Sequence, residues 1–228
     1  MRIVTTADGS KSLFSERFSE GYHSERGALT ESRMLFLDAS SIASRAAAGV
    51  ETRVVELGFG TGLNFFLAAD VALANSAPLT FISFEMELPP ASLLRELGYE
   101  HALGKPELLT AYLHWRENLE ATTGVHTFVY EHVSLVLVLG NMVHTIPQFD
   151  FGLVHVVLLD AFSPRTNPEP WKPDVLGHVM RALAPGAHVV TFTVAGSVRR
   201  SLIDFGLVVE KLPGPPGGKK EVLRGVKE

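Results

Sequence analysis

The chain has 228 residues, of which 46% are hydrophobic and 20% are charged, and its formal net charge is -5. This composition is typical of one α/β domain with a sizeable core, and the negative charge argues against a protein that coats nucleic acid without selectivity. No apolar run approaches the roughly 20 residues of a membrane span, and no signal-peptide pattern is present. With no cysteine, the chain cannot form a disulfide or a thiolate metal site. A cytoplasmic protein is expected.

Strands and helices alternate along most of the chain, after a polar first segment that contains a turn at 6–10. Strands are predicted from short β-branched and aromatic runs at 53–57, 79–85, 126–141 (one or two strands), 153–162, 188–194, 207–212 and 221–226. Helices are predicted at 27–37, 61–73, 91–98, 175–186 and 197–206. The alternation indicates an α/β fold with a mostly parallel, doubly wound sheet. The run at 153–162 is apolar on both faces, as expected of a central strand.

A glycine turn follows the first of these runs, in the sequence ELGFGTGLNF (56–65). Gly58, Gly60 and Gly62 are spaced two apart, whereas the dinucleotide fingerprint GxGxxG needs a glycine at the position of Leu63. Glu56 stands immediately before the turn, where it would repel a diphosphate but attract an ammonium group. S-adenosylmethionine carries an ammonium group and no phosphate. A plain glycine-rich turn is the structural alternative.

A second acid supports a ligand at this turn. Glu85 ends the run at 79–85, where a carboxylate can hold both hydroxyls of a ribose. Two acids at strand ends make a purely structural turn the weaker interpretation. The sequence therefore predicts S-adenosylmethionine as the ligand.

The segment LLDAFSPRTNPEPW (158–171) places another acid at the end of a core strand. A primary amine is nucleophilic only when neutral, so Asp160 is expected to orient an amine and to accept or relay its proton. Phe162 is expected to stack on a planar base and to hold the amine in line with the methyl group. The alternative is a structural loop capped by Asp160.

Together these segments resemble the MnmC-like methyltransferases, S-adenosylmethionine-dependent tRNA enzymes that complete the methylaminomethyl group of wobble uridine. The matching segments run in the family's order from residue 6 to 225 and are TADGS, YHSERGALTES, ELGFGTGLNF, DAFSPRTNPEPW, TFTVAGSVRRSL and GKKEVLRG. The resemblance implies a Rossmann-like methyltransferase fold and N-methylation of an aminomethyl group in the anticodon region of tRNA. It also implies one domain, 1–228, whose N-terminal extension (about 1–50) folds over the cofactor.

Many members of the family carry a fused flavin-dependent oxidoreductase that removes a carboxymethyl group. This sequence has no flavin fingerprint and no second domain. It is expected to be a free-standing methyltransferase that acts after a separate enzyme has made the aminomethyl precursor.

The resemblance also implies roles for single residues. Asp160 is expected to be catalytic and to touch the cofactor. The other residues expected at the cofactor are Tyr22, Glu56, Gly58, Gly60, Gly62, Asn64, Glu85, Met86 and Asn141. Those expected at the substrate are Phe162, Pro164, Arg199, Lys219 and Lys220, although solvated charge is the simpler interpretation of the three basic residues.

Two positions depart from the family's pattern. Asn141 stands where an Asp is usual near the adenine, and its side-chain oxygen can still accept from the adenine amino group. Met86 replaces a frequent basic residue and is expected to pack on the adenine face. The basic C-terminal motif is also altered, to GPPGGKKEVLRG.

Three other functions were weighed. An aminopropyltransferase similar to spermidine synthase shares the fold and an Asp after the fourth strand, but the NPEPW segment and the basic ending favour RNA. A catalytically silent tRNA-binding module is opposed by intact Glu56, Glu85 and Asp160. Metal binding is not expected, because none of the nine histidines lies in a ligand-like spacing.

Overall fold

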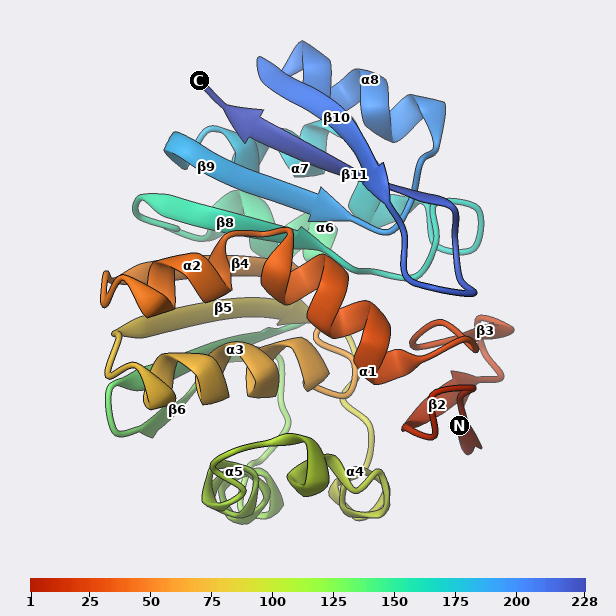
Figure 1. Ribbon diagram of the computed structural model, residues 1–228, viewed down its shortest axis with the longest axis vertical. Coiled ribbons are helices and arrows are strands. Elements are labelled where there is room, and N and C mark those ends of the chain that lie inside the picture. Colours follow the sequence, from red (N-terminus) through yellow and green to blue (C-terminus); the bar gives the residue numbers. More distant parts are fainter.

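The computed structural model describes residues 1–228 and contains two sheets (Figure 1). The smaller one is antiparallel and consists of β1 (Arg2–Thr5), β2 (Lys11–Ser15) and β3 (Glu20–Gly21). The main sheet has eight strands in the order β10-β11-β9-β8-β4-β5-β7-β6. Its strands are β4 (Thr52–Leu57), β5 (Leu79–Glu85), β6 (Gly124–Tyr130), β7 (Val133–Leu139), β8 (Val154–Leu159), β9 (Leu183–Thr191), β10 (Leu207–Pro213) and β11 (Glu221–Lys227).

Helices cover both faces of the main sheet. Their bounds are α1 (Ala28–Glu31), η1 (Ser32–Asp38), α2 (Ile42–Ala47), α3 (Leu63–Ala74), α4 (Ala91–Glu96), η2 (Tyr99–Ala102), α5 (Glu107–Glu117), α6 (Met142–Thr145), η3 (Ile146–Gln148), η4 (Glu169–Trp171), α7 (Pro173–Met180) and α8 (Gly196–Asp204). Successive strand residues point to opposite faces. Val54 therefore packs in a core with η1, α2, α3 and α5, and Val55 packs in a second core with α7 and α8.

The order in which successive strands are added to the main sheet reverses beside β4. From β4 the sheet runs through β5 to β7 on one side and through β8 to β9 on the other, and all four of these pairings are parallel. In such a sheet, ligands bind beside the carboxyl ends of the strands at the point of reversal. The glycine turn, Glu85 and Asp160 follow β4, β5 and β8 at this edge.

The predicted α/β fold and its mostly parallel central strands are confirmed, and the run at 126–141 forms two strands joined at Glu131 (φ 51). One helix prediction was too long. Helix α7 ends at Met180, and Leu183 to Gly186 begin β9, because the Leu183 region pairs with Val154 of the central strand. The helix predicted at 27–37 is one turn of α-helix followed by a π-helix, in which Ala39 N donates to Met34 O (3.2 Å).

Several elements were not predicted, namely the small sheet, α2 and α5. The three strands of the small sheet have four, five and two residues, which is too short for a clear alternation of polar and apolar residues. No helix in the fold is both long and apolar enough to cross a membrane.

Candidate active site

A cavity of about 470 Å³ lies at the carboxyl ends of β4, β5 and β8. Segments from the whole chain line it: the N-terminal sheet, the glycine turn, the ends of β5 and β8, and the loop between β10 and β11. Ten of the residues predicted from the sequence line this cavity: Tyr22, Gly58, Gly60, Asn64, Glu85, Met86, Asn141, Asp160, Phe162 and Lys219. The other five, Glu56, Gly62, Pro164, Arg199 and Lys220, do not.

Protein atoms, rather than open space for a ligand, lie against each glycine of the turn. Gly58, Gly60 and Gly62 have φ values of 98°, 53° and 79°, which residues with a side chain rarely adopt. A Cβ at Gly58 would lie 2.7 Å from the Asp160 carbonyl oxygen, and one at Gly60 would lie 2.9 Å from the Tyr22 ring. A Cβ at Gly62 would meet the Phe59 ring at 2.9 Å. The glycines therefore let the segment after β8 and the Tyr22 and Phe59 rings approach the turn, so that a ligand would lie beside it rather than against each glycine.

Glu56 lies beneath the cavity and is 1% exposed. Its carboxyl accepts from Asn64 Nδ2 at 2.9 Å and from Ser83 Oγ at 2.7 Å. Burial raises its pKa to about 8, although the two hydrogen bonds act in the opposite direction. Glu56 does not line the cavity, and its hydrogen bond with Asn64 connects it to the cavity floor.

Asn64 joins two acids at the floor of the cavity. Its Nδ2 donates to Glu56 Oε1 at 2.9 Å and to Asp160 Oδ2 at 2.8 Å. Its Oδ1 is buried and has no hydrogen-bond partner. Buried polar atoms are nearly always paired, so an unpartnered acceptor between two carboxyl groups fits a ligand that brings N–H donors. The ammonium group of S-adenosylmethionine is such a ligand.

Glu85 is held by three backbone N–H groups. Oε2 accepts from Gly60 N at 3.0 Å, and Oε1 accepts from Met86 N at 2.7 Å and from Glu87 N at 3.1 Å. Burial raises the pKa of Glu85, and these bonds oppose the rise. The carboxyl is thereby fixed at the cavity wall, and one acceptor position of Oε2 remains for a hydroxyl donor.

Asn141 and Met86 line the cavity next to Glu85. The Asn141 side-chain oxygen caps α6 by accepting from Val143 N at 3.0 Å, so one of its two acceptor positions is already used. Met86 is 46% exposed, and its side chain is free to pack on a flat ring.

Asp160 lies directly after β8, and its backbone N donates to Leu57 O at 3.0 Å. Burial raises the pKa of this carboxyl well above its usual value, and the charges of Glu56 and Glu31 raise it further. A carboxylate with a raised pKa is a stronger base than an ordinary aspartate. This shift favours Asp160 as a proton acceptor for a bound amine.

An aromatic cover closes the cavity from the N-terminal side. Phe18 stacks on Phe162 with ring centroids 4.5 Å apart, and Tyr22 meets the edge of the same ring at 5.1 Å. Glu20 accepts from the backbone N (3.2 Å) and Oγ (2.9 Å) of Ser163. The sequence analysis missed Phe18 and Glu20, and only their place beside the YHSERGALTES segment connects them to the site.

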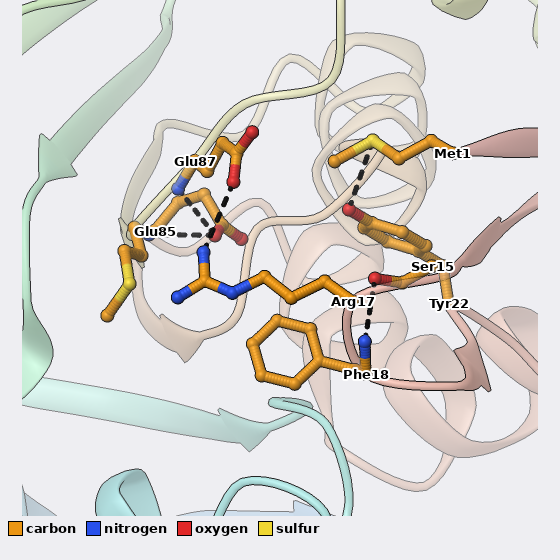
Figure 2. A network of polar contacts seen from close by, with 8 residues as sticks. Met1, Ser15, Arg17, Phe18, Tyr22, Glu85 and Glu87 are labelled. Carbon is orange, nitrogen blue, oxygen red and sulfur yellow. Dashed lines mark hydrogen bonds and ion pairs between the residues drawn. The ribbon is translucent and has the colours of Figure 1, made fainter.

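The cover also reaches the ribose end of the cavity, as Figure 2 shows. Arg17 lies 3.4 Å from Glu87, next to Glu85, and Phe18 N donates to Ser15 Oγ at 3.3 Å. The Tyr22 hydroxyl lies 3.6 Å from the Met1 sulfur. The N-terminal segment thus lies along both ends of the cavity.

The basic residues expected at the substrate separate into two groups. Lys219 lines the cavity, and its ammonium lies 3.9 Å from the centroid of the Phe192 ring. Arg199, on α8, and Lys220 are exposed outside the cavity, and Pro164 is partly buried in the loop after β8. No group of three His, Asp or Glu side chains is arranged to hold a metal ion.

Comparison with known proteins agrees with this geometry. The family model of S-adenosyl-L-methionine-dependent methyltransferases matches residues 107–228. The chain is 37% identical over 221 residues to the "tRNA 5-methylaminomethyl-2-thiouridine biosynthesis bifunctional protein MnmC" of Pseudomonas aeruginosa (strain UCBPP-PA14), covering 92% of this chain and 33% of the relative. The protein of the same name from Pseudomonas fluorescens (strain Pf0-1) is 36% identical over 91% of this chain.

Solved structures show the same likeness. MNMC2 from Aquifex aeolicus superposes with a TM-score of 0.79 at 29% identity, covering 98% of this chain and 69% of that one. Spermidine synthase from Thermotoga maritima shares the fold alone, with a TM-score of 0.54 at 11% identity.

The fold and the cavity define a protein that binds S-adenosylmethionine at the carboxyl edge of a mostly parallel sheet. The family match covers more than half of the chain, and the chain belongs to the S-adenosyl-L-methionine-dependent methyltransferase family. The predicted cofactor and the predicted resemblance to MnmC-like proteins are confirmed. The chain spans about a third of the length of the curated relatives that it matches.

Proposed function

We propose that this protein N-methylates the aminomethyl group on the wobble uridine of tRNA, converting 5-aminomethyl(-2-thio)uridine to 5-methylaminomethyl(-2-thio)uridine. The observation that carries the proposal is Asp160, a half-buried carboxylate with a raised pKa that faces the cavity in a chain 37% identical to MnmC. The reaction would take place in the cytoplasm, where tRNA is modified. It would follow a separate reaction that makes the aminomethyl group.

The chain would act as one methyltransferase unit, 1–228, with residues of about 1–50 covering the cofactor. Support comes from the contacts of Phe18 and Glu20 with the loop after β8, and of Arg17 with Glu87. A cover built in this way excludes water from the reacting atoms.

In this proposal the cofactor end is formed by Asn64, Asp160 and Glu85. The unpartnered Asn64 Oδ1 and the Asp160 carboxylate would receive the ammonium group, and Glu85 would receive the ribose hydroxyls. Met86 and Asn141 would flank the adenine. Bound S-adenosylmethionine supplies an electrophilic methyl group on a sulfonium.

The protein's own contribution to the chemistry is to hold a neutral amine in line with that methyl group. Asp160 accepts a hydrogen bond from the amine and takes up the proton that the nitrogen loses as its bond to carbon forms. Phe162, fixed by Phe18 and by Trp171 (whose Nε1 donates to Phe162 O at 2.8 Å), offers a face on which the base stacks. Positioning of this kind supplies much of the acceleration of a methyl transfer.

The test is methyl transfer from labelled S-adenosylmethionine to tRNA taken from cells that lack this protein, followed by mass spectrometry of the wobble nucleosides. We expect a mass increase of one methyl group on aminomethyluridine, and no increase on tRNA from cells that contain the protein. Absence of transfer by a protein that binds the cofactor in calorimetry would contradict the proposal.

The aminopropyltransferase is not favoured, because its support is a likeness of fold at 11% identity. A parallel reaction with decarboxylated S-adenosylmethionine and putrescine separates the two functions. A silent tRNA-binding module would bind tRNA in the same assays and transfer nothing.

A further inference from the structure

Lys219 lies on the loop between β10 and β11, which folds back toward the cavity. The loop is closed by hydrogen bonds from Gly214 N to Lys220 O (3.0 Å) and from Gly218 N to Pro215 O (3.0 Å). In Figure 1 it reaches from the main sheet toward β3. Lys219 lines the cavity, whereas the next residue, Lys220, does not.

The Lys219 ammonium lies over an aromatic ring. It lies 3.9 Å from the centroid of the Phe192 ring, which follows β9. Phe192 in turn meets the Trp171 ring edge-on at 5.9 Å, and Trp171 donates to the carbonyl of Phe162. A cation over an aromatic ring is attracted by the ring's negative face. Contacts through Phe192 and Trp171 therefore connect this ammonium to the loop that carries Asp160 and Phe162.

Three carboxyl groups from three different elements act on this ammonium. They are Glu31 of α1, Glu20 of β3 and Asp160 after β8. Lys219 makes no direct ion pair with any of them. Glu31 accepts from Ser24 N (2.9 Å), and Glu20 accepts from Ser163 Oγ (2.9 Å). Burial lowers the pKa of Lys219, and the three carboxylates oppose this change. The other ionisable side chains lining the cavity are Glu16, Arg17, Tyr22, His23, Glu85, Glu87 and Glu169.

We propose that Lys219 is a positioning residue for the acceptor, whose positive charge, held over Phe192 in the same cavity as Asp160, disfavours the protonated form of the incoming amine. This inference rests on the proposed function. It adds an explanation of how the charges at the acceptor end of the cavity keep the amine neutral. Three carboxylates alone would hold the substrate as an unreactive ammonium ion. A like charge beside the amine favours its neutral, nucleophilic form.

The same geometry argues against a phosphate contact for Lys219. A phosphate at this ammonium would approach Glu20, Glu31 and Asp160, which carry the same charge as the phosphate. Both lysines are exposed, but Lys219 lines the cavity and Lys220 does not. The two adjacent lysines therefore have different surroundings, and Lys220 is a matched control.

The experiment measures the single-turnover rate of methyl transfer against pH, with enzyme and cofactor saturating, so that the rising limb reports the amine within the complex. Lys219→Met should move this limb upward by about one pH unit, as expected for one charge lost at close range. At a pH below the limb, the rate should therefore fall about tenfold. Lys219→Arg keeps the charge and should keep the wild-type limb.

Glu31→Gln tests for a shift of the rising limb in the opposite direction. Glutamine keeps an acceptor for Ser24 N but removes a negative charge, so the limb should move downward. Lys220→Met should leave the limb at its wild-type position. This pair also tests the proposal if Lys219→Met does not fold, since the shift in Glu31→Gln is independent of that variant.

The inference is overturned if the limb stays at the same pH in both Lys219→Met and Glu31→Gln. A phosphate contact would instead raise the apparent KM for tRNA in Lys219→Met, make it more sensitive to salt and leave the limb unshifted. Failure of the underlying function has a different result, because the wild-type protein would then transfer no methyl group at any pH.

Discussion

The two ends of the cavity are built in different ways. At the cofactor end, Asn64 and Glu85 are fixed by groups on β4, β5 and the turn between β4 and α3, all within the sheet edge. At the acceptor end, Phe162 is held by Phe18, and Ser163 is held by Glu20, which lies 143 positions away in the chain. The difference indicates that the cofactor end is set by the sheet, whereas the acceptor end depends on loops from both halves of the chain. Substitutions at the two ends should therefore have different signatures.

The largest effect is expected at Asp160, which touches both ends. Asp160→Ala should lower the turnover number by about 10²-fold or more, because the base for the amine is lost. Cofactor affinity should fall less, since Asn64 keeps its hydrogen bond to Glu56 and Glu85 keeps its three backbone donors. Kinetics together with calorimetry measure both quantities.

Asp160→Asn sharpens the same comparison. It keeps an acceptor for the amine and loses the base, so tRNA binding should remain normal while turnover falls. Nearly full activity in this variant would mean that the amine loses its proton to water and that Asp160 only orients it.

The next effect is expected at the cofactor end, and it changes stability rather than rate. The folded-state pKa of Glu56 is about 8, above its ordinary value of 4.5, so the folded protein holds this proton more tightly than the unfolded chain does. Its contribution is fully present below about pH 4.5 and is lost as the pH rises toward 8. Glu56→Gln should remove about 3–4 kcal/mol of this pH dependence between pH 5 and 8. Denaturant unfolding at both pH values measures it, and parallel curves for the two proteins would show that Glu56 titrates normally.

A smaller effect is expected at the acceptor end. Phe162→Ala should raise the apparent KM for tRNA by the equivalent of about 1–3 kcal/mol, because a stacking surface for one base is lost. Phe18→Ala should have a weaker effect of the same kind, since it removes the support of that ring. Neither variant should change the affinity for S-adenosylmethionine greatly, and a large change in calorimetry would contradict the separation of the two ends.

The smallest effect is expected at the part of the cover over the ribose end. Arg17 and Glu87 form an ion pair in which both side chains are 62% exposed. Exposed pairs contribute at most about 1 kcal/mol, so Arg17→Ala should weaken cofactor binding by less than about fivefold. A titration in high salt is the control, because screening should bring the wild-type protein close to the variant.

The residues at strand ends could be located from the sequence, whereas the contacts around Phe162 could be located only in part. Glu56, Glu85 and the glycine turn stand at strand ends, and strand ends are visible as local patterns. The sequence could not show that Glu56 is covered by Asn64, since that depends on how α3 packs on β4. Glu20 and Glu31 carry no local pattern at all, and their role depends on contacts with residues far along the chain.

The basic residues show the same limit. Lys219, Lys220 and Arg199 are indistinguishable by charge, yet only Lys219 lines the cavity. Which of two adjacent lysines faces inward is decided by the turn that Gly214 and Gly218 make in the loop. Such a turn is set by tertiary contacts as much as by its own glycines and prolines.

The place of β11 in the sheet has a consequence for synthesis on the ribosome. β11 pairs with β10 on one side and with β9 on the other, so β10 has no neighbour in the sheet until β11 has formed. The loop that carries Lys219 connects these two strands and therefore forms with them. A nascent chain that has emerged as far as β9 already contains the strands and the turn of the cofactor end, and domains form as their parts emerge. The growing polypeptide should therefore be able to take up S-adenosylmethionine before it can accept a tRNA.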